Sequence, residues 1–577
     1  MKLNKLLLTA EVLALCAAPA IAQDFGDFGD FDDDSSAGAS SKIEVSGNVS
    51  MEARAYVDTE DNDKAADEKI EVTGKPSGKL ELSYSGNNSD MTLSLNMDAD
   101  MIKNNPEDII DELVLRERLG DYVTVEAGKM KIVWGKGDKL HVLDNFNADN
   151  YSDFIIPDYL DRRVSTPMIR GIISLPVANL NLEGVYTPLL PVDRFAVEGR
   201  WTPAQVSALT ASVTENAKNQ LAVTITQLEN ARMQAETAAS LKALGTTDAQ
   251  NKLKAMVTTA YTEGKISYTS AEVVAYCTEN GLDPTVPAYQ QAAAGAILAQ
   301  KYEAYLTQNL TDANSAYNLA LANVNSLSSN PGVIYPNMNT LKYGQFGGRA
   351  TWTLGQLDMG ISYYNGWYKQ PSVNASKIDS FITGYLANGK VSEDQKFLAY
   401  DKKQTFGVEA SSIIWHFNVR GEFAYNLTDD TKGTDPWVHN NSMAWLAGFD
   451  IDLPFWNANL NVQEIGTYVM KGDECDKNKA NVNYGTDVDY CANGYTNNKI
   501  AANFTASFMN DKIASEVTVM YGVENKDLVV LPKLSYKPDQ NLTLTVSGLF
   551  INCGDTNSEF KAWENNSFVS LGASYKF

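Results

Sequence analysis

The chain has 577 residues, of which 44% are hydrophobic, and a formal net charge of −25. This length is too great for one ordinary soluble core, and the acidity argues against a nucleic-acid partner, which needs a basic surface. The sequence contains only three histidines and no Gly-x-Ser-x-Gly, P-loop or zinc-ligand spacing, so it predicts neither an enzyme nor a cofactor.

Residues 1–22 have the pattern of an export signal peptide. Lys2 and Lys5 precede an apolar stretch, and Ala20-Ile21-Ala22 forms a small-x-small cleavage site. Lipid modification at Cys16 is the alternative, although Leu13-Ala14-Leu15 is a poor lipobox because a bulky Leu stands where a small residue is expected. Residues 23–41 are acidic and rich in Gly, so we expect a disordered spacer, with a docking motif for a periplasmic partner as the alternative.

After the signal there is no run of about 18 apolar residues, so the sequence predicts no transmembrane helix. A membrane location would therefore require a closed barrel, because only helices and barrels pair all their backbone groups in lipid. From Ile43 onward apolar and polar residues alternate with a period of two, as in 43–57, 91–97, 458–463 and 541–548. A soluble sandwich would show the same alternation.

Three features favour a transmembrane barrel over a sandwich. Short turns alternate with long polar connections, aromatic residues lie near strand ends, and the alternating final segment ends on Phe577. The short turns are at 86–90, 355–356, 510–511 and 538–540, and the long connections are at 58–69, 100–108, 134–163, 369–403, 427–442, 470–498 and 553–566. The segments predict an all-β antiparallel barrel of about 16–18 strands, with eighteen the best count and both ends in the periplasm.

The alternation stops at residues 203–329. This stretch has no Phe or Trp, is rich in Ala, and places Leu209, Val213 and Ala217 at helical spacing. It predicts an antiparallel helical hairpin with a small cap at its tip, inserted in an outer loop. The barrel would then consist of an N-terminal part, 42–202, and a C-terminal part, 330–577.

A family resemblance rests on the segment 127–138, Ala-Gly-Lys-Met-Lys-Ile-Val-Trp-Gly-Lys-Gly-Asp, and on 343–349 and 361–367. These residues resemble a widespread family of porin-like outer-membrane barrels that share a G-[KR]-Q-x-x-x-W-G-x-x-D strand and loop, with Met130 in place of the usual Gln. The acidic tail and the insert also resemble parts of spirochaetal outer-membrane proteins. The resemblance implies a pore or substrate channel with no named solute, and a terminal strand that barrel-assembly machinery recognises through Phe577.

The candidate site residues are charged groups of the polar strand face and of the loop after Trp134. A bulge at Gly128 would turn both following lysines inward, and a ring of charges could then set selectivity. The pore-lining candidates are Glu126, Lys129, Lys131, Arg349, Glu409, Arg420 and Glu422. Wall residues that are merely solvated or paired are the alternative.

The loop from Trp134 to Arg163 holds apolar residues that an exposed loop would not need, so we expect it to fold inward and narrow the pore. Its candidate residues are Asp138, Asp144, Asp149, Asp153, Arg162 and Arg163. The aspartates could bind a cation such as Ca²⁺, but no EF-hand spacing is present and no metal site is predicted. We expect a local disulfide between Cys475 and Cys491. Cys277 and Cys553 are then left over, and they could pair with each other and pin the insert to the rim if they come within reach.

The sequence therefore predicts an outer-membrane channel for passive diffusion of small solutes, surrounded by membrane lipid and with homo-oligomers as an option. The alternative is a surface adhesin or interaction protein that displays the helical insert. A TolC-like exit duct fits less well, because this chain has strands enough to close a barrel alone.

Overall fold

The computed structural model describes residues 42–57, 70–196, 199–329, 331–482, 495–554, 558 and 560–577. The expected signal peptide and acidic tail lie outside these ranges. Within them, the helices are either too short or too polar to cross a membrane. The described chain forms two compact units, one built on strands and one on helices.

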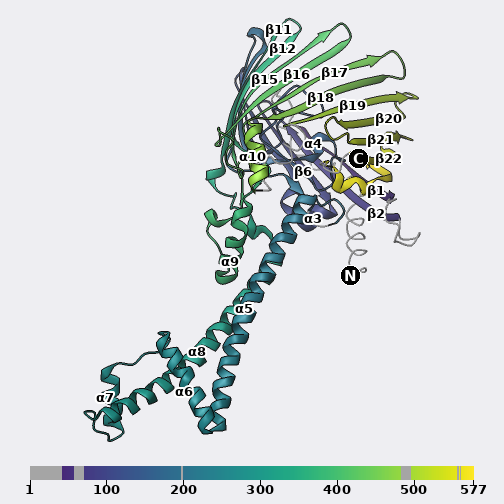
Figure 1. Ribbon diagram of the computed structural model, residues 1–577. Coiled ribbons are helices and arrows are strands. Elements are labelled where there is room, and N and C mark those ends of the chain that lie inside the picture. Colours follow the sequence, from purple (N-terminus) through teal and green to yellow (C-terminus); the bar gives the residue numbers. More distant parts are fainter. Residues whose placement is uncertain are drawn as a thin grey trace, which may run out of the picture. The chain divides into compact units, whose positions relative to one another are not determined.

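The strand unit is a closed antiparallel barrel of eighteen strands, in which each strand pairs with its neighbours in the sequence and β23 returns to pair with β1. The barrel strands are β1 (Lys42–Val57), β2 (Ile70–Ser85), β3 (Ser89–Asp98), β4 (Ile110–Leu119), β5 (Val123–Met130), β8 (Thr166–Leu175), β9 (Leu180–Thr187), β11 (Gln345–Leu354), β12 (Leu357–Trp367), β15 (Lys402–Ile414), β16 (Phe417–Thr428), β17 (Ser442–Leu453), β18 (Ala458–Val469), β19 (Thr496–Phe508), β20 (Ile513–Gly522), β21 (Leu528–Tyr536), β22 (Leu542–Asn552) and β23 (Phe568–Lys576). Figure 1 shows the strands from β11 to β22 following one another around the barrel wall. The predicted fold class and strand number are confirmed.

The two faces of the wall follow the alternation in the sequence. On β1, Ile43 and Val45 are exposed, whereas Arg54 and Tyr56 are only 2% exposed. Successive side chains of a strand point to opposite faces, and directly paired residues share a face, so the register carries this division from strand to strand around the barrel. The outer face is therefore apolar, and the inner face is mostly polar.

Connections at the two ends of the barrel differ in length. The short turns are 86–88, 120–122, 176–179, 355–356, 415–416, 454–457, 509–512 and 537–541. The connections at the other end are 58–69, 99–109, 131–165, 188–344, 368–401, 429–441, 470–495, 523–527 and 553–567. Of these, only 523–527 is as short as a turn, and β1 begins and β23 ends at the end that carries the short turns.

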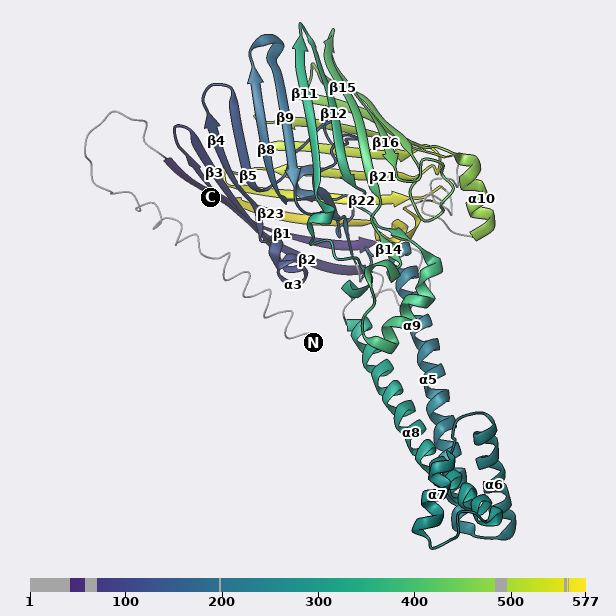
Figure 2. The same cartoon turned by 90° about the vertical axis from the view of Figure 1, so that its left-hand side faces the viewer.

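The helical unit contains the two long helices that the spacing predicts, α5 (Ala204–Leu244) and α8 (Pro287–Ser329). Figure 2 shows them running side by side, with α6 (Thr247–Thr262) and α7 (Ser270–Glu279) at the tip. Ala238 of α5, Val257 of α6 and Tyr302 of α8 share one buried cluster. The hairpin is therefore held by small and aromatic side chains, and α6 and α7 form its cap.

One helix of this unit comes from a different part of the chain. The connection 369–403 is expected to be a polar loop, yet it contains α9 (Ile378–Asn388), whose Phe381 and Ile382 are fully buried. The Asn323 amide of α8 donates to the carbonyl oxygens of Tyr385 and Leu386 at 3.2 and 3.0 Å. The expectation of a polar connection was wrong here, because the apolar face of α9 packs against α8.

Candidate functional site

The connection 131–165 between β5 and β8 folds into the barrel. It contains β6 (Ala148–Tyr151), α4 (Tyr159–Arg162) and β7 (Arg163–Val164), and β6 also pairs with β10 (Arg194–Phe195). Figure 1 draws β6 and α4 against the ring of strands. We call 131–165 the inner loop. Its contacts reach inward-facing side chains on both sides of the barrel.

An apolar cluster fixes the first part of the inner loop to the wall. Trp134 and Phe146 are at most 1% exposed and pack edge to face with ring centroids 5.0 Å apart. Phe146 also meets Tyr364 of β12 at 5.2 Å. A Cβ at Gly347 of β11 would lie 2.9 Å from both Phe146 and Trp134, so the wall needs glycine there for the loop to approach.

Hydrogen bonds join the same part of the loop to wall carboxylates. The Trp134 indole donates to Glu183 at 2.9 Å. The backbone N–H groups of Lys136 and Gly137 donate to Glu422 Oε1 at 2.6 and 2.7 Å. The Val142 N–H donates to Glu422 Oε2 at 2.9 Å. One buried carboxylate therefore accepts three backbone hydrogen bonds from the loop.

Ion pairs extend from the loop to more distant strands. Asp138 pairs with Arg420, which also pairs with Asp450 of β17. Lys139 reaches Glu516 of β20 at 2.5 Å. These contacts place the first half of the loop across the lumen from β16 to β20.

The second half of the loop is held by another part of the wall, formed by β21, β22, β23, β1 and β2. Asp153 accepts two hydrogen bonds from the Arg54 guanidinium, at 2.6 and 2.9 Å, and pairs with Lys75 at 2.7 Å. Next to it, Phe154 stacks on Trp201 with centroids 5.7 Å apart, inside a buried apolar cluster that includes residues of β21, β22 and β23. The inner loop thus crosses the lumen between two walls.

A buried charge cluster stabilises the loop internally. Arg163 pairs with Asp144 at 2.9 Å and with Asp149 at 3.2 Å, and Arg162 lies 3.5 Å from Asp149. Burial raises the pKa of the Asp144 carboxyl, and the Arg163 guanidinium acts in the opposite direction. Tyr159 donates to Asp144 at 2.5 Å. The described residues contain no group of acidic, His or Cys side chains placed to hold a metal ion, and the loop aspartates pair with basic side chains instead.

Most of the pore-lining candidates interact with charged groups of the inner wall or with the inner loop. Glu126 accepts from Arg116 at 2.7 Å and from Arg170 at 3.1 Å. Arg349 pairs with Glu409 of β15. Glu422 lies directly opposite Glu409 on the neighbouring strand β16. Four predicted residues, Arg349, Glu409, Arg420 and Glu422, therefore come together beside the inner loop, whereas Glu126 lies in a separate part of the wall.

The placement of Lys129 differs from the expectation. The register of β5 runs through Gly128 without interruption, with Lys129 opposite Leu113 and Pro167 on the outward face. Its ammonium donates to the carbonyl oxygens of Glu107 and Ile110 in the connection after β3. Lys131 pairs with Asp111 at 2.7 Å. A register shift occurs instead between β3 and β4, at Ser94 and Leu95. Lys129 is therefore not turned inward by Gly128, whereas the inward orientation of Lys131 stays a prediction.

Two lysines beside the loop are not predicted by the sequence. Lys369 donates to Gln345 at 2.6 Å and to the Tyr364 hydroxyl at 3.3 Å. Lys403 donates to Asn145 at 2.6 Å. Burial lowers the pKa of Lys369 well below its usual range, and the nearby positive charge of Lys403 adds to the lowering. No local sequence signal marks these lysines, because both occur in polar stretches.

The Lys369→Met variant is expected to raise the free energy of unfolding at pH 7 by about 1–2 kcal/mol, because an apolar side chain replaces a partly buried charge. A lowered folded pKa means that stability falls as the pH drops below the ordinary lysine value, so the gain should shrink as the pH rises toward about 10.4. Urea denaturation in detergent at pH 7 and pH 10 measures both effects. A less stable variant, or a gain that grows with pH, would contradict the assignment.

The cysteine expectations are tested only in part. Cys475 is buried in α10 (Gly472–Val482) beside Val469 and Tyr495, and Cys491 lies outside the described residues. Cys277 and Cys553 carry free thiols. Cys277 is fully buried in the insert, 3.8 Å from the carbonyl oxygen of Tyr289. The Cys475–Cys491 disulfide therefore stays a prediction.

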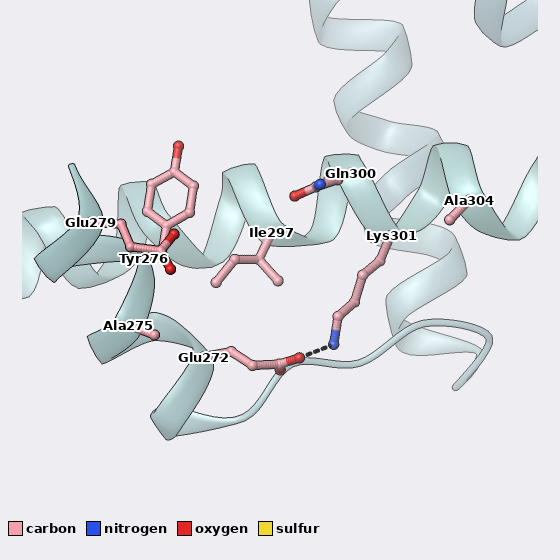
Figure 3. Close-up of a pocket in the computed structure, with 8 residues that line it drawn as sticks. All are labelled: Glu272, Ala275, Tyr276, Glu279, Ile297, Gln300, Lys301 and Ala304. Carbon is pink, nitrogen blue, oxygen red and sulfur yellow. Dashed lines mark hydrogen bonds and ion pairs between the residues drawn. The ribbon is translucent and has the colours of Figure 1, made fainter.

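The helical unit has a surface hollow between α7 and α8, shown in Figure 3. It is lined by Glu272, Ala275, Tyr276, Glu279, Ile297, Gln300, Lys301 and Ala304. Lys301 pairs with Glu272 at 2.7 Å, which leaves Glu279 as the remaining charged group of the lining. An exposed ion pair of this kind contributes little, and the hollow offers few groups that could recognise a ligand.

No protein-family model matches the chain, and no curated protein matches its sequence. Matches among solved structures include a BenF-like porin from Pseudomonas fluorescens Pf-5, at 9% identity and a TM-score of 0.39 over 93% of this chain and 98% of that chain. They also include OccAB4 of Acinetobacter baumannii, at 9% identity and 0.38 over 92% and 98%. OmpF of Salmonella typhi, in complex with daunomycin, matches at 7% identity and 0.35 over 93% and 97%. At these values no residue role transfers to this chain.

Proposed function

We propose that this protein is an outer-membrane channel through which small solutes diffuse passively. The observation that carries the proposal is a closed eighteen-strand barrel, apolar outside and polar inside, with a loop folded across its lumen. A barrel with no free edge can lie in lipid because every strand is paired on both sides. Barrels of 16–18 strands are wide enough that an aqueous channel remains even where a loop narrows the lumen.

The proposal extends to topology and partners. Short turns belong to the periplasmic end of bacterial barrels and longer loops to the outer end, so the helical insert and α9, both in long connections, would lie outside the cell. Export would use the N-terminal signal, and assembly would use the terminal strand ending on Phe577. The inner loop would form the constriction, and Arg349, Glu409 and Arg420 would be the charges beside it.

Single-channel recording in planar bilayers tests the proposal. The purified full-length protein and a variant with 208–329 replaced by a short Gly/Ser linker are expected to give discrete conductance steps, because the pore belongs to the barrel. Shifted migration of the unheated protein in gels would show that each sample is folded. Folded protein that conducts in neither form would overturn the channel and would favour a surface-display role for the insert.

Protease accessibility on intact cells tests the topology. Cleavage near Gly245 or Gly281, which both lie at loops of the insert tip, is expected if the insert is outside. Protection of these sites in intact cells, together with cleavage after the outer membrane is permeabilised, would reverse the orientation.

A further inference from the structure

Glu422 is expected from the sequence to line the pore, but its carboxylate does not face an open lumen. Its side chain is 0% exposed. Besides the three backbone N–H groups of Lys136, Gly137 and Val142, His141 Nδ1 lies 3.3 Å from Oε1. The loop therefore wraps the carboxylate from residue 136 to residue 142.

The local sequence of the loop permits this wrapping. Gly135 has φ of +116°, and a Cβ there would lie 2.3 Å from Glu422 Oε1 and 2.8 Å from Oε2. Any other residue at this position would be strained and would collide with the carboxylate. Trp134 and Gly135 therefore have separate roles: the Trp134 indole binds Glu183, and Gly135 lets the backbone approach Glu422.

The hydrogen bonds to Glu422 are charge-assisted and buried, which makes them stronger than ordinary ones. If the carboxylate were removed, three partly buried N–H groups would lose their acceptor, which is costly inside a protein. The nearby contacts of Asp138 and Lys139 are side-chain ion pairs with partly exposed groups, at 43% and 41%. Glu422 is therefore the anchor that fixes the backbone of this half of the loop.

We propose that Glu422 is a positioning residue that sets the bore of the channel by holding the inner loop across the lumen, and not by contacting the solute. This inference rests on the proposed channel function. It predicts that loosening the anchor widens the pore while the barrel stays folded, because the wall strands on either side of β16 are paired independently of the loop.

The test compares E422Q with D358N in planar bilayers. The amide of Gln keeps the size of the side chain but removes the charge and turns donors toward the loop N–H groups. Asp358 is a matched control, since it is an inward carboxylate on β12 that accepts from wall residue Thr353 at 2.6 Å. E422Q is expected to raise the mean conductance roughly two-fold and to admit larger polyethylene glycols, whereas D358N should change neither.

The G135A variant disrupts the same contact from the side of the loop. It tests the proposal even if E422Q fails to fold. It should reproduce the larger conductance and polymer cut-off, because the added Cβ displaces the loop from the carboxylate. Wild-type conductance and polymer cut-off in both folded variants would overturn the anchor role while leaving the channel intact. A wild-type protein that does not conduct would overturn the proposed function instead.

Discussion

Replacing Arg54 with alanine is expected to lower the free energy of unfolding by about 3–5 kcal/mol, the usual cost of removing one partner of a buried ion pair. Arg54 is 2% exposed and binds Asp153 through both terminal nitrogens, and one of them also binds Glu52 at 2.9 Å. Its guanidinium also lies 4.8 Å from the Phe568 ring. Urea denaturation in detergent measures the loss.

A double substitution at the two positions separates the ion pair from its surroundings. Arg54→Met with Asp153→Leu should recover much of the stability lost in Arg54→Ala, because an apolar pair replaces the two buried charges. Arg118→Ala is the control, since Arg118 pairs with Asp90 but is 45% exposed, and its loss should cost about 1 kcal/mol or less. If Arg54→Ala and Arg118→Ala lower the free energy of unfolding equally, the contact between Arg54 and Asp153 of the loop adds no more stability than an exposed ion pair.

Deleting Phe577 is expected to lower the equilibrium constant for folding of the barrel about ten-fold or more, and to reduce the amount of folded barrel in the membrane. Phe577 and Gly47 exchange two backbone hydrogen bonds, of 3.0 and 3.1 Å, at the seam where β23 meets β1. Their loss would cost about 1–3 kcal/mol, and about 1.4 kcal/mol lowers the equilibrium constant for folding ten-fold. The deletion would also remove the terminal residue expected to be recognised during assembly.

Phe577→Ala distinguishes the two contributions, because it keeps the backbone hydrogen bonds and removes the ring. The amount of heat-modifiable protein in outer-membrane fractions measures assembly in cells. The yield of refolding into detergent measures the contribution of the β23–β1 seam alone. A loss in cells but not in detergent for Phe577→Ala would assign the ring to recognition. Wild-type levels of the deletion variant in both assays would contradict a role for the terminus.

Prediction from the sequence succeeds best where a local period defines structure. Alternation along β1 and β23 predicted strands with one buried face, and the spacing of Leu209, Val213 and Ala217 predicted α5. It failed for α9, because that helix is short and part of its apolar face is buried against α8, a segment far away in the chain. It also failed at Gly128, because a glycine permits a bulge without requiring one.

The candidate site was foreseen as a region and not as a set of contacts. Apolar residues such as Phe146 and Phe154 in a long loop implied burial, and both are at most 3% exposed. Charged residues of the wall were foreseen as lining groups, but their partners were not. Arg349 binds Glu409, and Arg420 binds Asp138, so these groups act in pairs.

By itself, the sequence determined the barrel, its strand number and the helical insert, because alternation and helical spacing are local properties that each segment carries alone. Only the tertiary structure decided how the inner loop is held, because its attachments join residues far apart in the chain. Lys136 and Glu422 are 286 positions apart, and Arg54 and Asp153 are 99 apart. Closure of the barrel brings these partners within hydrogen-bonding distance. The Glu422 carboxylate, which the sequence predicts to face the solute, therefore anchors the loop.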